Sequence, residues 1–243
     1  MAAFKTIDDW LFFCTYIENR NRYVLDEDCS EFLTSLKETS TKRISTLESG
    51  KILYRSRIGV DEGWILKDRE KLQAGDYFYR RALPPEDMGA PPSDKATEGR
   101  MNPKGIPYLY LASDIETAIA EMRPWLKEQI SVGKFELSKN IRVLDTSNDK
   151  FLFKRENLTP EEVEKKIWGD INISLSRPVL KNEINIKYAP TQYITEIFKN
   201  QGLDGIIYSS SLQKSGRNYI IFDPKLFECK KANYFWLMKF SIN

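Results

Sequence analysis

The sequence contains no histidine. This absence excludes Ser–His–Asp triads, metal sites built on imidazole, and imidazole acid–base chemistry. Catalysis by this chain would therefore depend on carboxylates, hydroxyl groups, lysine or arginine. We also expect no metal, because the three cysteines, Cys14, Cys29 and Cys229, are odd in number and too scattered for a zinc site.

Long apolar runs and a surplus of one charge are missing as well. No stretch approaches the roughly 20 apolar residues of a membrane span, and Asp8 and Asp9 follow the start too closely for a signal peptide. The 37 basic and 35 acidic residues give a formal net charge of +2. That balance gives no electrostatic footprint for nucleic acid or an anionic membrane. Few, scattered cysteines are typical of a reducing compartment, so we expect a cytoplasmic protein.

The length and the order of patterns predict an α+β protein with an N-terminal appendage. The 243 residues suffice for one large domain or for a domain with an extension. Residues 6–39 predict two helices, capped by Thr6 and by Asp26. Residues 40–50 are polar and predict a linker. We therefore divide the chain into a helical extension, residues 1–45, and a catalytic domain, residues 46–243.

The second part alternates strand and helix patterns. Strands are predicted over residues 51–58, 108–112, 130–137, 140–145, 205–208 and 218–222, with another around 234–240. A capping box at Thr159 and Glu162 predicts an exposed helix to about Trp168, and Thr191 begins an amphipathic helix that Gly202 ends. Residues 59–98 read as irregular, and the proline-rich loop 76–98 as a lid or wall beside a site.

The stretch from Gly99 to Glu121 has the densest set of local signals. A Gly/Pro turn carrying Arg100 and Asn102 leads into a short apolar strand, and Ser113-x-x-Glu116 then predicts a capping box that opens a helix. The spacing of Ile115, Ala118, Ile119 and Met122 predicts the buried face of that helix. Glu121 lies one residue off this stripe, so its carboxylate can face a cleft while the helix stays packed.

Two other segments carry candidate functional residues. On the strand 51–58, alternation places Arg55 and Arg57 on one face, which suits either an anion site or exposed charges on an edge strand. The buried strand 205–208 ends at Ser209-Ser210-Ser211, where hydroxyl groups can line a site. Taken singly, each of these residues has an ordinary structural explanation.

Together, the three segments resemble the RES domain family over residues 50–232. The family block has Gly-Arg-(aromatic or apolar)-Asn, a Tyr-containing strand and Ala-x-x-Glu, matched here by Gly99-Arg100-Met101-Asn102, Tyr110 and Ala118-Ile119-Ala120-Glu121. Met101 stands where an aromatic residue is more usual. The late Tyr-Pro-Ser motif corresponds to Tyr208-Ser209-Ser210, which aligns Ser210 with the family serine.

The resemblance implies an ADP-ribosyltransferase-like mixed β core with flanking helices, and a cleft that binds NAD as the substrate. We assign catalytic roles to Glu121, Arg55 and Ser210. A carboxylate can stabilise the cation-like sugar formed when the nicotinamide–ribose bond breaks, and arginines can grip pyrophosphate. The residues that we expect around the nucleotide are Arg100, Tyr110, Arg57, Asn102, Ser209 and Tyr208.

The expected function is that of an intracellular NAD glycohydrolase or phosphorylase, acting as a bacterial toxin or defence effector. The resemblance implies an inhibitory antitoxin as the partner. Two alternatives stay open: transfer of ADP-ribose to a protein, and an inactive interaction module, against which the intact set of arginine, tyrosine, glutamate and serine argues. The sequence identifies neither the acceptor nor the inhibitor, and leaves open both homo-oligomer formation and the roles of residues 1–45 and 150–190.

Overall fold

The computed structural model describes residues 4–65, 77–148, 157–180 and 182–236. Their strands form an eight-stranded sheet in the order β1-β7-β8-β9-β5-β2-β6-β10. The parallel pairing of β7 with β8 within an otherwise antiparallel ladder makes the sheet mixed. The bounds of these strands are β1 (Ile44–Leu47), β2 (Ile52–Ile58), β5 (Leu109–Ala112), β6 (Gln129–Leu137), β7 (Ile141–Asp145), β8 (Gly205–Ser209), β9 (Arg217–Ile221) and β10 (Phe227–Trp236).

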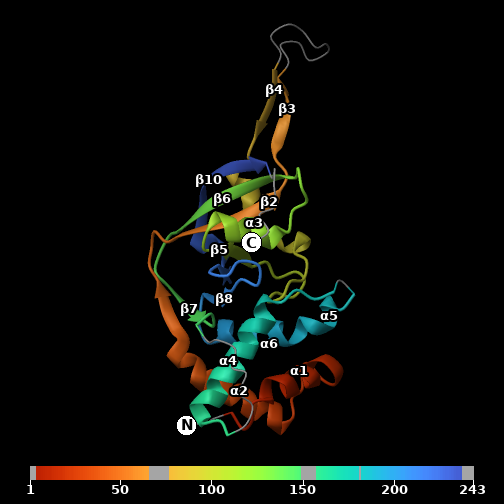
Figure 1. The fold of residues 1–243 in the computed structure, drawn as a ribbon, viewed down its shortest axis with the longest axis vertical. Helices are drawn as coiled ribbons and strands as arrows, with labels where there is room; N and C mark the ends of the chain where they lie inside the picture. The colour runs from red at the N-terminus through yellow and green to blue at the C-terminus, as the bar shows by residue number, and fades with distance from the viewer. Residues whose placement is uncertain (1–3, 66–76, 149–156, 181, 237–243) are drawn as a thin grey trace.

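The sheet has a narrow joint between β5 and β2. These strands share a single register pair, Tyr54 with Ala112, whereas β2 pairs with β6 along its whole length, from Ile52 to Ile58. The joint separates β2, β6 and β10 from the other strands, and these two groups occupy the upper and middle parts of Figure 1.

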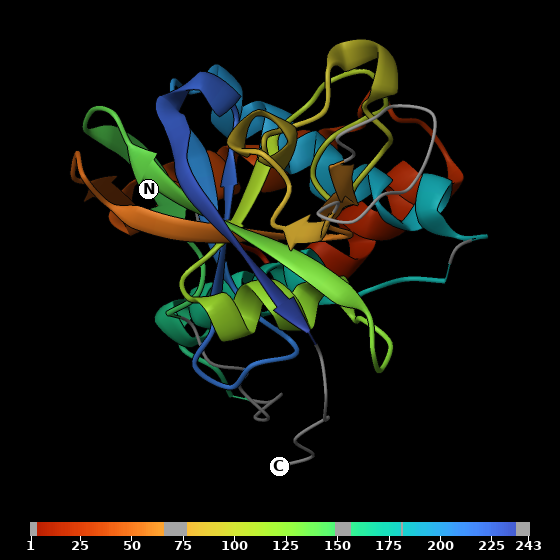
Figure 2. The same cartoon turned by 90° about the horizontal axis from the view of Figure 1, so that it is seen from above.

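The helices lie around the twisted strands, as the view from above shows (Figure 2). Four of them, α1, α2, α4 and α6, gather at one end of the molecule, and α3 lies near β2 in the upper half (Figure 1). The bounds are α1 (Asp9–Asn19), α2 (Glu27–Ser40), α3 (Ile115–Met122), α4 (Pro160–Ser176), α5 (Ile184–Lys187) and α6 (Ala189–Asn200). The prediction of a mixed β core with flanking helices and two helices at the N-terminal end is confirmed.

Two hydrophobic clusters cover opposite faces of the central strands. Ile206 and Tyr208 of β8 belong to the cluster that includes α1, α2, α4 and α6, whereas Ile207 belongs to a second cluster. This alternation follows from the two-residue period of a strand. Because α1 and α2 share the first cluster with β8, the N-terminal helices pack as part of the main body. The predicted boundary at residue 45 falls inside β1, and the division into two domains stays a prediction.

Several sequence predictions of secondary structure are wrong. Residues 40–50 are no linker, because they contain β1, which pairs with β7. Residues 59–98 contain β3 (Asp61–Ile65) and β4 (Tyr77–Arg81), an antiparallel ribbon that projects from the body (Figure 1). The helix that Thr159 caps, α4, continues to Ser176 and buries one side, including Ile167, Trp168, Ile171 and Leu175.

The predictions of where other helices and strands begin and end are partly right. Asp26 caps α2 as expected, since its carboxylate accepts the Cys29 N–H at 2.9 Å. Thr6 does not cap α1: the N-cap is Asp8, and the Thr6 hydroxyl donates to the Asp9 carboxylate at 2.7 Å. The predicted strand 234–240 corresponds to the end of β10, and its residues 237–240 lie outside the described residues.

Candidate active site

The helix α3 positions Glu121 in its last turn. It begins after Asp114, whose carboxylate accepts the Thr117 N–H at 2.7 Å and the Thr117 hydroxyl at 2.8 Å. The predicted capping box on Ser113 is therefore wrong, because the neighbouring aspartate is an equally good N-cap. Although burial opposes it, hydrogen bonds from Ser113 and Thr117 lower the pKa of Asp114. The helix ends at Arg123, which adopts the left-handed conformation with φ of 48°.

The buried face of α3 is turned relative to the prediction. Thr117 and Ala118 are buried, whereas Met122, expected inside, is 36% exposed. Thr117 lies four residues before Glu121, and residues at this spacing share one side of a helix. The turned face explains how the Glu121 side chain points inward, toward β9, while remaining half-buried.

Two donors converge on one oxygen of Glu121. The Ser210 hydroxyl donates to Oε1 at 2.8 Å, and the Asn218 amide donates to the same oxygen at 2.7 Å. Among the described residues, no hydrogen bond reaches Oε2. Asn218 is buried on β9, opposite Tyr208 of β8 and Ala112 of β5. The carboxylate is thus fixed through one oxygen, and the other is available to a ligand.

The sequence predictions missed Asn218. Its one sequence signal is an amide at the start of the otherwise apolar strand Asn218-Tyr219-Ile220-Ile221-Phe222. A buried polar residue in such a run requires a hydrogen-bond partner, and here that partner is the predicted catalytic carboxylate.

The serines at the end of β8 contact two different elements, α3 and α4. The Ser210 hydroxyl accepts the N–H groups of Leu212 at 3.1 Å and Gln213 at 3.2 Å, which orients its proton toward Glu121. Ser209, which is predicted to lie near the nucleotide, contacts Asn172 of α4. This geometry agrees with the alignment that selects Ser210 as the family serine.

Arg100 and Tyr208 lie beside the carboxylate. Burial acts to lower the pKa of Arg100, but the neighbouring hydroxyls of Tyr208 and Tyr188 and the Glu121 charge outweigh it and raise that pKa. Burial also raises the pKa of Tyr208, so its hydroxyl keeps its proton at neutral pH. One nitrogen of Arg100 donates to the Leu175 carbonyl at 3.5 Å, a long bond that a stronger acceptor can replace.

The turn that carries Arg100 is held by polar contacts from three sides. The Tyr110 hydroxyl donates to the Asn102 side chain at 2.8 Å, and the Asn102 amide donates to the Thr97 carbonyl at 2.9 Å. From α6, the Gln192 amide donates to the carbonyls of Gly99 and Asn102 at 2.8 and 3.1 Å. The side-chain amide of Asn102 and the Tyr110 hydroxyl therefore brace the turn from inside the protein.

Gly99 is required at the tightest point of this turn. A Cβ atom there would lie 2.4 Å from Asn102 Oδ1 and 2.8 Å from the Tyr110 hydroxyl. We expect Gly99→Ala to lower the free energy of unfolding by about 1–3 kcal/mol, as overpacked sites do. Urea denaturation measures this. Gly89→Ala is the matched control, because a Cβ atom there meets no atom closer than 4.0 Å; equal stability of the two variants would contradict the expectation.

The two arginines of β2 occupy different surroundings. Arg57 donates to the Gly89 carbonyl at 2.6 Å and so holds the segment that follows β4. Burial, reinforced by the charge of Arg57, lowers the pKa of Arg55 to about 10, which still leaves Arg55 a cation at neutral pH. In the described part of the chain, the buried side-chain atoms without a hydrogen-bond partner are Arg55 Nη1, Ser56 Oγ, Arg57 Nε and Gln129 Oε1.

Unpartnered guanidinium nitrogens inside a protein favour binding of an anion, since a buried donor without an acceptor is costly. The structure thus forms two groups from the predicted residues. One group surrounds Glu121, and the other surrounds Arg55, whose pKa responds to the charges of Arg57 and Tyr110. None of the hydrogen bonds or ion pairs of the described residues joins Arg55 to Glu121. The members of the first group are Glu121, Ser210, Asn218, Arg100 and Tyr208.

A separate cavity of about 880 Å³ lies between α1 and α2. Phe12, Phe13 and Phe32 contribute to its lining, and none of the predicted site residues does. In the described ranges there is no cluster of three or more His, Cys, Asp or Glu residues suited to a metal ion. The helices in those ranges include none with the length and apolar character needed to span a membrane.

Comparison with known proteins shows to which family this chain belongs. A search of curated proteins finds no match. One similar solved structure is described as the crystal structure of the M. tuberculosis MbcT–MbcA toxin–antitoxin complex, with 12% sequence identity, coverage of 82% of this chain and 91% of that chain, and a TM-score of 0.42. The family model of the RES domain matches residues 76–240, more than half of the chain. The chain therefore belongs to the RES domain family.

Proposed function

We propose that this protein cleaves the nicotinamide–ribose bond of NAD and acts as a toxin or defence effector inside the cell. The observation that carries the proposal is the Glu121 carboxylate, held at one oxygen by Ser210 and Asn218 and flanked by Arg100. Membership in the RES domain family supports it, because characterised members of that family destroy NAD. The absence of histidine from the sequence fits this chemistry, which requires no imidazole.

The proposed reaction breaks the bond between the nicotinamide nitrogen and the anomeric carbon of the ribose. Nicotinamide leaves with the electron pair, and the ribose carbon becomes cation-like. A fixed carboxylate beside this carbon stabilises the developing charge electrostatically. In this proposal, Oε2 of Glu121 faces the sugar, while Ser210 and Asn218 hold Oε1 and prevent the side chain from turning away.

Arg55 and Arg100 would bind the pyrophosphate of NAD. A guanidinium group matches two phosphate oxygens with two parallel donors. Arg55 has an enclosed nitrogen without a partner, and Arg100 has a nitrogen on a long bond of 3.5 Å, so both have donating capacity to offer. Phosphate binding would satisfy the Arg55 nitrogen that the protein alone leaves unpaired.

Replacing either arginine by alanine is expected to weaken NAD binding. Loss of a hydrogen bond to a charged group typically costs about 1.5–3 kcal/mol, which corresponds to roughly tenfold or more in Kd. Arg55→Lys and Arg100→Lys should restore affinity only in part, because an ammonium group lacks the planar fork. Calorimetric titration with NAD checks this, and unchanged affinity in both alanine variants would place the pyrophosphate elsewhere.

Activity is expected to survive treatment with a chelator. The proposed chemistry is carried by a carboxylate, two arginines and a hydroxyl group. NAD cleavage measured before and after EDTA treatment and desalting should agree. Loss of activity that is restored by a divalent ion would instead indicate a metal site built on carboxylates.

The experiment that tests the proposal is identification of the products formed from NAD by the purified protein. Nicotinamide with ADP-ribose would indicate hydrolysis, and nicotinamide with a phosphorylated ADP-ribose, formed only with added phosphate, would indicate phosphorolysis. Nicotinamide release that depends on an added protein, with a matching mass increase on that protein, would indicate ADP-ribosyl transfer. Absence of nicotinamide under all three conditions would contradict the proposal. An inhibitory antitoxin, which the family implies, stays a prediction.

A further inference from the structure

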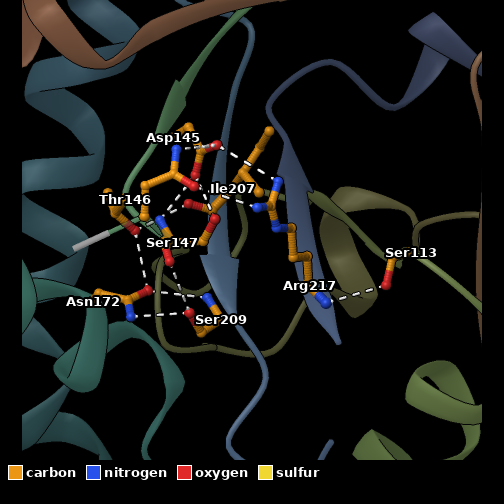
Figure 3. A network of polar contacts seen from close by, with 9 residues as sticks. Ser113, Asp145, Thr146, Ser147, Asn172, Ile207, Ser209 and Arg217 are labelled. Atoms are coloured by element: carbon orange, nitrogen blue, oxygen red, sulfur yellow. Dashed lines mark hydrogen bonds and ion pairs between the residues drawn. The ribbon is translucent and has the colours of Figure 1, made fainter. Parts of the chain in front are cut away.

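The last residue of β8 is held by a side chain from the helical layer. Asn172 of α4 accepts the Ser209 N–H at 3.0 Å through Oδ1 and donates to the Ser209 hydroxyl at 3.1 Å through Nδ2. Figure 3 shows the Asn172 amide facing Ser209 and Thr146. Thr146 ties this group to the strand, because its hydroxyl oxygen lies 3.3 Å from Asn172 Oδ1 and 3.0 Å from the Ile207 carbonyl oxygen, and its N–H donates to the same carbonyl at 2.9 Å.

We infer that Asn172 is a positioning residue, which holds the end of β8 in the register set by its ladder with β9, so that Ser210 reaches Glu121. This inference rests on the proposed function of Glu121. Asn172 is buried, with 7% of its surface exposed, and its side-chain amide both donates to and accepts from one residue, Ser209. A two-point contact of this kind fixes a direction as well as a distance.

Register matters here because three serines stand in a row. Successive side chains of an extended segment point to opposite sides, so a shift of one residue would bring Ser209 or Ser211 toward Glu121. With Ser209 held on α4, Ser210 is left on the side of Glu121, where its hydroxyl bonds Oε1. The sequence alone gives no preference among three identical side chains. In the structure the β8–β9 ladder sets the backbone register, with Ser209 opposite Arg217 and the Ser210 N–H donating to the Gly216 carbonyl at 2.9 Å, and the contact with α4 holds Ser209 in that register.

A second contact from the same helix supports this role. The Ser211 hydroxyl donates to the Ser176 carbonyl at 3.1 Å, one helical turn after Asn172. The serines on both sides of Ser210 are therefore attached to α4, and Ser210 alone of the three is attached to Glu121.

The partner strand is fixed on its own side of the hairpin. The Arg217 N–H donates to the Ser113 hydroxyl at 3.1 Å, and its guanidinium lies 3.8 Å from the Asp145 carboxylate (Figure 3). Arg217 precedes Asn218, the second donor to Glu121. The residues next to the two donors are therefore both held in place, Ser209 by Asn172 and Arg217 by Ser113 and Asp145.

The test replaces Asn172 and compares it with a change on the same helix. Asn172→Ala should lower kcat for NAD cleavage by about tenfold or more, with a smaller effect on KM, because a loosened end of β8 misplaces Ser210. Asn172→Asp should retain most activity, since a carboxylate accepts the Ser209 N–H and also a proton from its hydroxyl. The control is Ser174→Ala. The Ser174 hydroxyl accepts the Trp10 indole N–H at 2.9 Å and has no hydrogen bond to the serine run, so this variant should have lower stability and an unchanged kcat.

Non-additivity separates positioning from general damage. If Asn172 acts through Ser210, Asn172→Ala should change the residual rate of Ser210→Ala by less than about twofold, since residues that act as a unit are not additive. A full additional loss in the double variant, or unchanged kcat in Asn172→Ala, would overturn the inference.

Amide hydrogen exchange keeps this test separate from the proposed function. Faster exchange at Ser209, Leu212 and Gln213 is expected in Asn172→Ala, and none in Ser174→Ala, whether or not the protein cleaves NAD. These three amides are hydrogen-bonded in the intact serine run. Unchanged exchange in folded Asn172→Ala would overturn the positioning role of Asn172. Faster exchange in a protein that never consumes NAD would support that role and contradict the proposed function.

Discussion

Replacing Glu121 by glutamine is expected to abolish NAD cleavage while leaving the fold intact. Glutamine keeps the length of the side chain and one carbonyl oxygen, which can still accept from Ser210 and Asn218. What is lost is the negative charge beside the reacting sugar. Removal of a single electrostatic stabiliser of a transition state typically lowers kcat by about 10²–10³-fold, so we expect a loss of at least that size.

The measurement is the rate of NAD loss at matched concentrations of folded protein. Glu116→Gln provides the control, because Glu116 is exposed on the same helix and has no contact with Ser210 or Asn218. Thermal unfolding should give nearly the same Tm for both variants and the parent protein. Turnover at the parent rate by folded Glu121→Gln would rule out the assignment of Glu121.

Ser210→Ala is expected to have the second largest effect. The change removes the donor that holds Glu121 Oε1, as well as the acceptor of the Leu212 and Gln213 N–H groups, and it changes the volume little. Asn218 would then be left as the other donor to that oxygen, and the carboxylate would gain freedom to turn. We expect kcat to fall by about tenfold or more, the usual scale for loss of a hydrogen bond to a charged group.

The neighbouring serines serve as controls for this prediction. Ser209→Ala keeps the N–H that Asn172 accepts, and Ser211→Ala removes one bond to a helix carbonyl, so both should be mild. Steady-state kinetics of the three single variants decides the matter. If Ser209→Ala were the inactive variant, the register would be off by one residue; if all three retained full activity, the late motif would serve structure alone.

Local signals in the sequence predicted the features that short segments determine. The capping box at Thr159 forms, with the Glu162 side chain accepting the Thr159 N–H at 2.8 Å. Gly202 follows α6 with a φ of +77°, as a helix-terminating glycine does. The placement of Glu121 after a capped helix start was likewise readable, although the cap is Asp114 rather than Ser113.

Features that depend on distant partners were not readable. The strand β1 lies in a largely polar segment, and its pairing with β7, almost a hundred residues later, makes it a strand. The helix α4 continues past Trp168 because Ile171 and Leu175 pack into the main cluster, a fact set by the fold and not by the local pattern. Competing caps were also undecidable, since adjacent residues such as Ser113 and Asp114 have similar capping preference.

The candidate site divides in the same way. Glu121, Arg100 and Ser210 lie in motifs with recognisable spacing, and the structure brings these three to one place. Asn218 and Asn172 belong to no motif, and the sequence does not indicate which residue each of them contacts. Both are defined by long-range contacts, across 97 and 37 residues of chain respectively.

The most direct test of the central claim is a crystal structure of the Glu121→Gln variant with NAD bound. We predict that the anomeric carbon of the nicotinamide ribose lies next to residue 121, with Ser210 and Asn218 on the far side of that side chain. The pyrophosphate should contact Arg55 and Arg100. NAD seated instead in the cavity of about 880 Å³ between α1 and α2, or bound with its nicotinamide ribose away from residue 121, would contradict the account.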